Sequence, residues 1–138
     1  MVVLIDTNIL LNFILKRDPY YKESAQIITW CAEKRLHGYL AFHSLSTIWY
    51  VLRKKTDEER RDWLKNICSI LSVSSADTDD VLDALSRVNF KDFEDCLQDK
   101  CAKNVHADYL ITGNVKDYAD AETQAITPDD FCSLVRDE

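Results

Sequence analysis

Short apolar runs alternate along the chain with longer stretches in which apolar residues recur every three or four positions. Residues 2–5 (VVLI) form a continuous apolar run, which favours a strand buried on both faces. Residues 25–32 show the spacing that is typical of a helix with one apolar face. The pattern predicts strands at 2–5, 39–42, 70–73, 109–112 and 124–127. It predicts helices at 9–15, 19–37, 44–55, 56–67, 77–88, 93–105 and from 128 onwards.

Alternating strands and helices indicate an α/β fold with a mainly parallel sheet. The chain has only two glycines and two prolines, without repeats or low-complexity linkers, so we expect one domain over residues 1–138. Gly38 is expected to end the second helix. In such folds ligands bind beyond the carboxyl ends of the strands, so the residues that directly follow each strand are the candidates for function.

Polar side chains cluster in sequence at these strand ends. Asp6 follows the first strand, three candidates follow the fourth strand, and an acidic pair opens the preceding helix. The candidates are Asp6, Glu94, Asp95, Thr112, Asn114 and Asp117. Several hard oxygen ligands in one cleft suit Mg²⁺ or Mn²⁺, which can activate a water and neutralise charge on a phosphodiester.

Each carboxylate also has an ordinary structural alternative. Asp6 is suited to capping the following helix, and an acidic residue at position 94 or 95 is favoured by the dipole of the helix it opens. Asp117 is equally compatible with a solvated loop. The spacing alone therefore leaves both the metal site and the structural roles open.

Four segments resemble the PIN-domain family of metal-dependent nucleases. Residues 2–15 (VVLIDTNILLNFIL) resemble the family's opening, and residues 91–118 (KDFEDCLQDKCAKNVHADYLITGNVKDY) resemble its C-terminal signature. Residues 42–54 (FHSLSTIWYVLRK) are similar to its third-helix region and residues 125–131 (AITPDDF) to its final strand and helix. The resemblance implies a three-layer α/β/α sandwich with a central, mainly parallel sheet. It also implies cleavage of RNA phosphodiester bonds with Mg²⁺ or Mn²⁺.

Carried over residue by residue, the resemblance makes Asp6, Asp95 and Asp117 catalytic metal ligands, with Asn114 as a further ligand. Asn8, Glu94 and Thr112 are supporting polar groups. One position departs from the family, because Thr47 stands where the third helix usually carries a glutamate. No acidic residue lies between Glu33 and Asp57 to replace it. The alternative to an active ribonuclease is therefore a degenerate PIN-like module that binds RNA or protein without cleaving.

The resemblance also implies partners, because many small members are VapC-type toxins that a cognate antitoxin neutralises. RNA and an antitoxin are thus the expected partners, and a homodimer is compatible with the sequence. No run is long enough to cross a membrane, and a signal peptide is not expected at the N-terminus. Five cysteines without zinc-site spacing indicate a reducing, cytoplasmic compartment.

The net charge of −7 argues against an unspecific nucleic-acid coat protein, yet its distribution is uneven. Residues 1–69 carry a balance of +3 and residues 70–138 a balance of −10. The basic clusters of the first half suit contacts with RNA phosphates, and the acidic second half contains the candidate metal ligands. A phospho-acceptor receiver domain is a weaker alternative, because only one acidic residue directly follows the first strand and serines follow the third.

Overall fold

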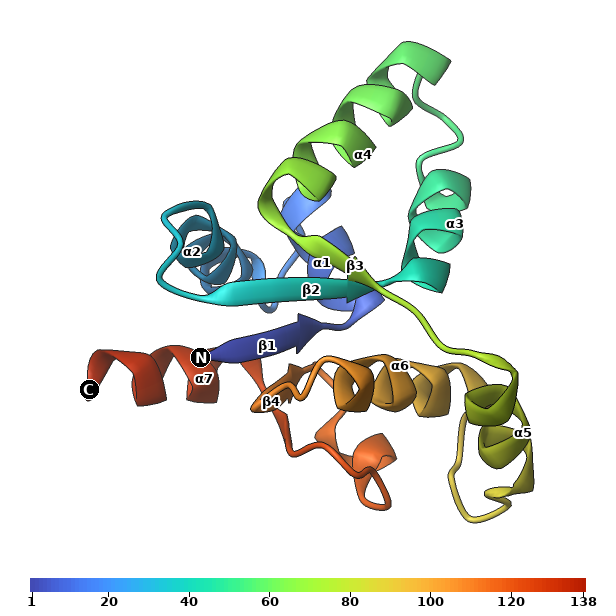
Figure 1. The fold of residues 1–138 in the computed structure, drawn as a ribbon. Coiled ribbons are helices and arrows are strands. Elements are labelled where there is room, and N and C mark those ends of the chain that lie inside the picture. The colour runs from blue at the N-terminus through green and yellow to red at the C-terminus, as the bar shows by residue number, and fades with distance from the viewer.

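The computed structural model describes residues 1–138, with five parallel strands between layers of helices (Figure 1). The strands are β1 (Val2–Ile5), β2 (His37–Ala41), β3 (Ser72–Ser74), β4 (Tyr109–Ile111) and β5 (Ala125–Ile126). The helices are α1 (Thr7–Ile14), α2 (Tyr21–Ala32), α3 (Phe42–Val51), α4 (Asp57–Ile70), α5 (Thr78–Ser86), α6 (Phe93–Asn104), the 3-10 helix η1 (Val115–Tyr118) and α7 (Pro128–Arg136). The predicted α/β/α sandwich is confirmed.

The strand order is β3-β2-β1-β4-β5, so the first strand lies in the centre of the sheet. In β1, Val3 and Ile5 face one apolar cluster, whereas Leu4 faces the other. Apolar residues on both faces explain why the run has no polar alternation. Because β1 is central, its carboxyl end borders both β2 and β4. Strands β2 and β3 are added on one side of β1, and β4 and β5 on the other, so this is the topological switch point of the sheet.

The helices divide between the two faces of the sheet. The larger cluster contains apolar side chains of α1, α2, α4 and α7, and the smaller one contains side chains of α5 and α6. In Figure 1, α3 and α4 stand away from the sheet as an arm, whereas α5 and α6 lie on the opposite side of it. None of the helices is both long and apolar enough to span a membrane.

Two predicted boundaries differ from the structure. Helix α4 continues through Ile70, and β3 begins at Ser72, because the apolar residues before it pack as the end of the helix. Gly38 does not end α2 but lies inside β2, while Lys34 turns the chain with a φ of 62°. A Cβ on Gly38 would lie 2.6 Å from both Cys31 Sγ and Leu71 Cδ2, so only glycine lets β2 approach these side chains.

Candidate metal centre at the edge of the sheet

Asp6 occupies the end of the central strand and is almost fully buried. Its backbone N–H donates to the carbonyl of Ile111 (2.9 Å), which continues the β1–β4 pairing to the edge of the sheet. The residue stands at the N-cap position of α1, yet its side chain makes no capping hydrogen bond. Instead, Thr112 Oγ1 donates to Asp6 Oδ2 over 2.9 Å. The Asp6 side chain is therefore held by the residue that follows the neighbouring strand, and it does not cap α1.

Tyr118 joins Asp6 to a second carboxylate, that of Asp95. The Tyr118 hydroxyl lies 3.5 Å from Asp6 Oδ2 and 3.2 Å from Asp95 Oδ1. The Tyr118 ring is buried and packs edge-to-face on Phe90, with 6.0 Å between the ring centroids. A hydroxyl has one proton to donate, so it satisfies one of the two carboxylates at a time. We call Asp6 and Asp95 the acid pair, and the hydroxyl of Tyr118 bridges them.

The first turn of α6 is fixed by its cap, which places Asp95 at the site. Asp92 accepts a hydrogen bond from the backbone N–H of Asp95 over 3.1 Å, so the helix begins at Phe93 as predicted. Because α6 packs beneath β1 and β2, its first turn lies against the carboxyl end of the sheet. Sequence positions 6, 95 and 118 thus meet through three different elements.

The electrostatics of the acid pair disfavour two negative charges. Burial raises the pKa of Asp95 to about 7, and the charges of Asp6 and Asp92 add to the effect. Burial also raises the pKa of Asp6, although the hydrogen bond from Thr112 opposes the shift. Burial and both carboxylates raise the pKa of the Tyr118 phenol, which stays a neutral donor. A cation is the group that would stabilise the pair in its ionised form.

A second, fully polar cluster lies beside the acid pair between α1, α3 and α6. Gln98 is completely buried, and its Nε2 lies 3.0 Å from Thr7 Oγ1, 3.0 Å from Ser44 Oγ and 3.3 Å from His43 Nε2. The two hydroxyls are also 2.7 Å from each other. Gln98 Oε1 has no partner. This cluster fixes the start of α3 against α6 and the residue that follows Asp6.

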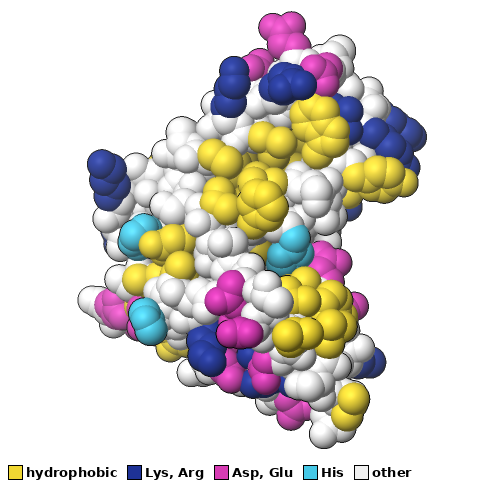
Figure 2. All heavy atoms as spheres, turned by 45° about the vertical axis from the view of Figure 1, so that its right-hand side comes forward, with side chains coloured by type: hydrophobic (Ala, Val, Ile, Leu, Met, Phe, Trp, Pro, Cys, Tyr) yellow, Lys and Arg dark blue, Asp and Glu magenta, His cyan; other side chains and the backbone are white.

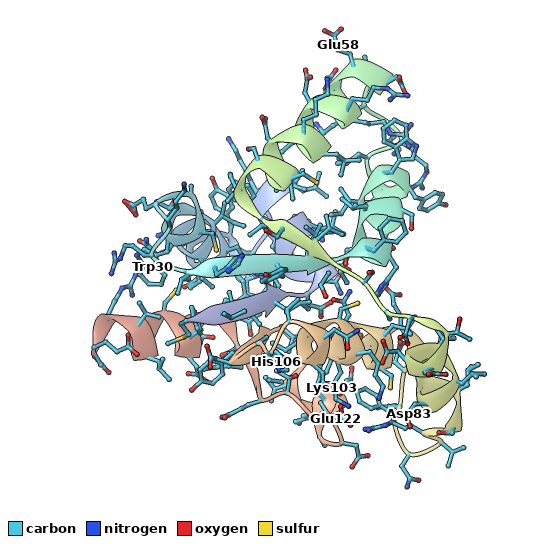
Figure 3. The ribbon with its side chains drawn as sticks, viewed as in Figure 1. Trp30, Glu58, Asp83, Lys103, His106 and Glu122 are labelled. Atoms are coloured by element: carbon cyan, nitrogen blue, oxygen red, sulfur yellow. The ribbon has the colours of Figure 1, made fainter.

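The segment that carries Tyr118 is anchored by charged groups of α6. The buried carboxylate of Asp99 accepts hydrogen bonds from the backbone N–H groups of Glu122 (2.9 Å) and Thr123 (3.0 Å). Lys103 Nζ lies 3.1 Å from Glu122 Oε2, and Figure 3 shows these two side chains together on the side of the sheet where α6 lies. These contacts hold the chain after η1 on α6, close to Asp95.

The other predicted site residues lie farther from the acid pair. Asp117, next to Tyr118, is half-buried and acts on Asp95 only through its charge. Asn114 is exposed, and its backbone N–H donates to Thr112 Oγ1 over 3.1 Å. Asn8 is exposed on α1. No set of three or more carboxylate, histidine or cysteine side chains converges closely enough to hold a metal ion. The structure thus brings together two of the three predicted acids.

Thr47 and Glu94 flank the acid pair in different ways. Thr47 Oγ1 lies 3.5 Å from the carbonyl of His43 one turn earlier, so its hydroxyl is directed at its own helix. The negative charge of Glu94 raises the pKa of both Asp6 and His43. Helix α3 therefore contributes a threonine and a histidine near the site, and no carboxylate.

The donor set fits a divalent cation of the hard class. Mg²⁺ commonly uses one or two protein carboxylates and keeps several waters, so Asp6 and Asp95 are sufficient anchors. The raised pKa values of these carboxylates and the absence of any cationic side chain within hydrogen-bond reach of them support this fit.

The chain is a parallel α/β sandwich with an acid pair at the carboxyl edge of its central strand. The sequence profile described as "PIN domain" matches residues 2–116. The chain therefore belongs to the PIN domain family, as its resemblance predicted.

Individual relatives share this architecture over nearly their full length. Ribonuclease VapC1 of Aquifex aeolicus is 26% identical over 134 residues, which cover 94% of this chain and 92% of the relative. The structure of VapBC-1 from Haemophilus influenzae superposes with a TM-score of 0.70 at 16% identity, covering 94% of this chain and 99% of that one. VapBC2 from Rickettsia felis, bound to a DNA fragment of its promoter, gives a TM-score of 0.68 at 18% identity, with 92% and 98% covered.

Sequence reasoning missed Tyr118 and Gln98. Tyr118 ends the VKDY segment, but a tyrosine after an acidic residue carries no distinctive signal. Gln98 was detectable, because the helical spacing places it on the same face as the apolar Cys101 and Ala102. A glutamine at a buried helical position needs polar partners, and those partners lie here at the site.

Proposed function

We propose that this chain is a divalent-metal-dependent endoribonuclease and the toxin of a toxin–antitoxin pair. The observation that carries the proposal is the acid pair of Asp6 and Asp95 at the carboxyl end of the sheet in a PIN-domain chain. The ribonuclease activity named for the Aquifex relative supports the reaction, and the VapBC complexes support an antitoxin as protein partner.

In the proposed site Asp6 and Asp95 would hold Mg²⁺ or Mn²⁺, with Asp117 and Asn114 as further candidate ligands. The metal ion supplies a lowered pKa for a bound water and charge neutralisation at the phosphate. Thr112 orients Asp6 through its hydrogen bond, and Tyr118 keeps the two carboxylates at a fixed separation. Asn8, Glu94 and Thr47 make no hydrogen bond to either carboxylate of the pair.

The distribution of surface charge supports RNA as substrate. Figure 2 shows several Lys and Arg side chains over the upper part of the molecule, where α3 and α4 lie, with some Asp and Glu among them, and more Asp and Glu below together with a few Lys and Arg. Within this basic surface Arg61 is paired with Asp57 (2.8 Å), whereas Arg53, Lys54 and Lys55 make no ion pair with a carboxylate. Unpaired cations at the end of α3 suit contacts with a phosphate backbone.

Thr47 favours a second candidate function, that of a PIN-like module that binds without cleaving. Its hydroxyl replaces a carboxylate and bonds within its own helix, and the structure holds no trio of metal ligands.

The five free cysteines, four of them buried, support the proposal of a reducing, cytoplasmic environment for either function.

Cleavage of a single-stranded RNA in Mn²⁺ distinguishes the two. The wild-type chain, Asp6→Asn and the exposed-site control Asp62→Asn are compared with and without a chelator. We expect cleavage by the wild type and the control that the chelator stops, and a loss of at least about a hundredfold in Asp6→Asn. Equal cleavage by wild type and Asp6→Asn would refute the proposed centre. RNA binding without cleavage by any of the three would assign the binding module.

A further inference from the structure

A small pocket opens where α3, α5 and α6 meet after β3. It has a volume of about 150 Å³, and its walls include Phe42, His43, Val81, Leu97 and Ser75. Phe42 is 65% exposed although it is aromatic, and it stands at the first position of α3. At about 30 Å³ per water the space holds roughly five waters, which is the scale of one planar ring and too little for a folded partner element.

The pocket is linked to the site through His43, which is one of its walls. His43 Nε2 lies 3.3 Å from Gln98 Nε2, and Gln98 contacts Thr7, the residue that follows Asp6. A single polar side chain, that of Gln98, therefore connects the pocket wall to the residue next to Asp6.

Gln98 also fixes the orientation of the His43 ring. Because the glutamine is completely buried and contacts two hydroxyls besides His43, the imidazole has a defined partner on its inner edge. The ring is thereby available as a rigid wall, next to the exposed face of Phe42. Two aromatic groups, an apolar floor formed by Val81 and Leu97, and the hydroxyl of Ser75 surround one space.

We infer that this pocket receives one unstacked base of a single-stranded RNA whose backbone lies across the acid pair. The inference deepens the proposed ribonuclease function and rests on it. Proteins that recognise single-stranded RNA stack its bases on aromatic side chains and read their edges through hydrogen bonds. Phe42 and His43 supply the stacking surfaces, and Ser75 supplies a donor and acceptor for the ring edge.

An apolar side chain of a partner protein is the competing occupant. Leu82 and Leu85 are also exposed on α5, so a protein that docks here would cover them together with Phe42. A base would enter the pocket alone and leave Leu82 uncovered, because Leu82 is outside the pocket wall. The two occupants therefore differ in whether Leu82 contributes.

The test uses a short single-stranded RNA carrying 2-aminopurine, a fluorescent base whose emission falls on stacking. Binding is measured in the Asp6→Asn background, so that cleavage does not interfere, and Phe42→Ala, Phe42→Tyr and Leu82→Ala are added to it. We expect saturable quenching, lost in Phe42→Ala with binding weakened about tenfold. Phe42→Tyr restores it, and Leu82→Ala binds like the background protein.

Unchanged quenching and affinity in Phe42→Ala would overturn the inference. An equal loss in Phe42→Ala and Leu82→Ala would overturn it in favour of a wider apolar docking surface. A wild-type chain that cleaves no RNA in Mn²⁺ would refute the proposed function, whereas the quenching measured in the non-cleaving background would report separately on the pocket. Phe42 is mostly exposed, so its replacement is compatible with folding, and a thermal unfolding curve verifies that.

Discussion

Asp95→Asn is expected to make the metal-free protein more stable at neutral pH while removing its response to metal. The pKa of this carboxyl group is raised from 3.8 to about 7 by burial and by neighbouring negative charges. Below about pH 4 the group is protonated in the folded and unfolded states alike, so it costs no stability there. Between about pH 4 and pH 7 the unfolded chain releases its proton first, and stability falls as the pH rises.

The magnitude follows from the size of the pKa change. For a fully buried group the change corresponds to about 4 kcal/mol, and because Asp95 is only partly buried, solvent screening reduces this to about 2 kcal/mol. Asparagine has the same shape and carries no charge. We therefore expect the free energy of unfolding of Asp95→Asn to exceed that of the wild type by about 2 kcal/mol near pH 8, and to match it near pH 4.

Urea unfolding at a series of pH values measures this difference directly. The exposed Asp62→Asn is the matched control, because its side chain lies on the outer face of α4 and its replacement should leave the pH dependence unchanged. Mn²⁺ should restore stability to the wild type near pH 8 and have little effect on Asp95→Asn, since a ligand stabilises only the state that binds it. Parallel pH profiles for wild type and Asp95→Asn would refute the electrostatic account of the acid pair.

Three further variants test other parts of the site. Tyr118→Phe keeps the packing on Phe90 but removes the bridging hydroxyl, so the free energy of unfolding without metal should fall by about 1 kcal/mol. Mn²⁺ should raise the melting temperature of this variant more than that of the wild type, and an equal rise would contradict the proposal that the hydroxyl bridges the two carboxylates. Thr47→Glu adds a carboxylate on α3 and should tighten Mn²⁺ binding about tenfold in calorimetry, whereas unchanged affinity would show that this position faces away. Asp99→Asn leaves one buried backbone N–H poorly paired, so the free energy of unfolding should fall by about 1–3 kcal/mol and the Glu122 amide should exchange its hydrogen faster; unchanged protection of that amide would contradict this role of Asp99.

The parallel sheet and its buried first strand could be predicted from the sequence because local patterns decide them. The apolar run before Asp6 has no polar alternation, which is the pattern of a strand buried on both faces, and β1 has apolar clusters on both sides. The strand order depends on how distant segments pair and had to come from the structure. Helix α4 begins where it is predicted, because Thr56 caps it and a capping side chain acts on residues only three positions away.

The details of the site depended on contacts that no local pattern encodes. Nothing near Tyr118 indicates that its hydroxyl reaches two carboxylates, because those belong to β1 and α6. The same holds for Gly38, whose role is set by the approach of Cys31 and Leu71 from two other elements. That Asp117 and Asn114 hold a metal ion stays a prediction.

The sequence separation of the acid pair's contacts has a consequence for the synthesis of the protein. Asp6 and its partner Thr112 are 106 residues apart, and Asp6 and Tyr118 are 112 apart. While a ribosome is still adding the second half of the chain, Asp6 has no partner strand β4 and no hydroxyl to hold it. The contacts that hold the acid pair are therefore completed only after Tyr118 has emerged. A truncated or unfinished copy carries the opening motif of the family but cannot assemble its centre.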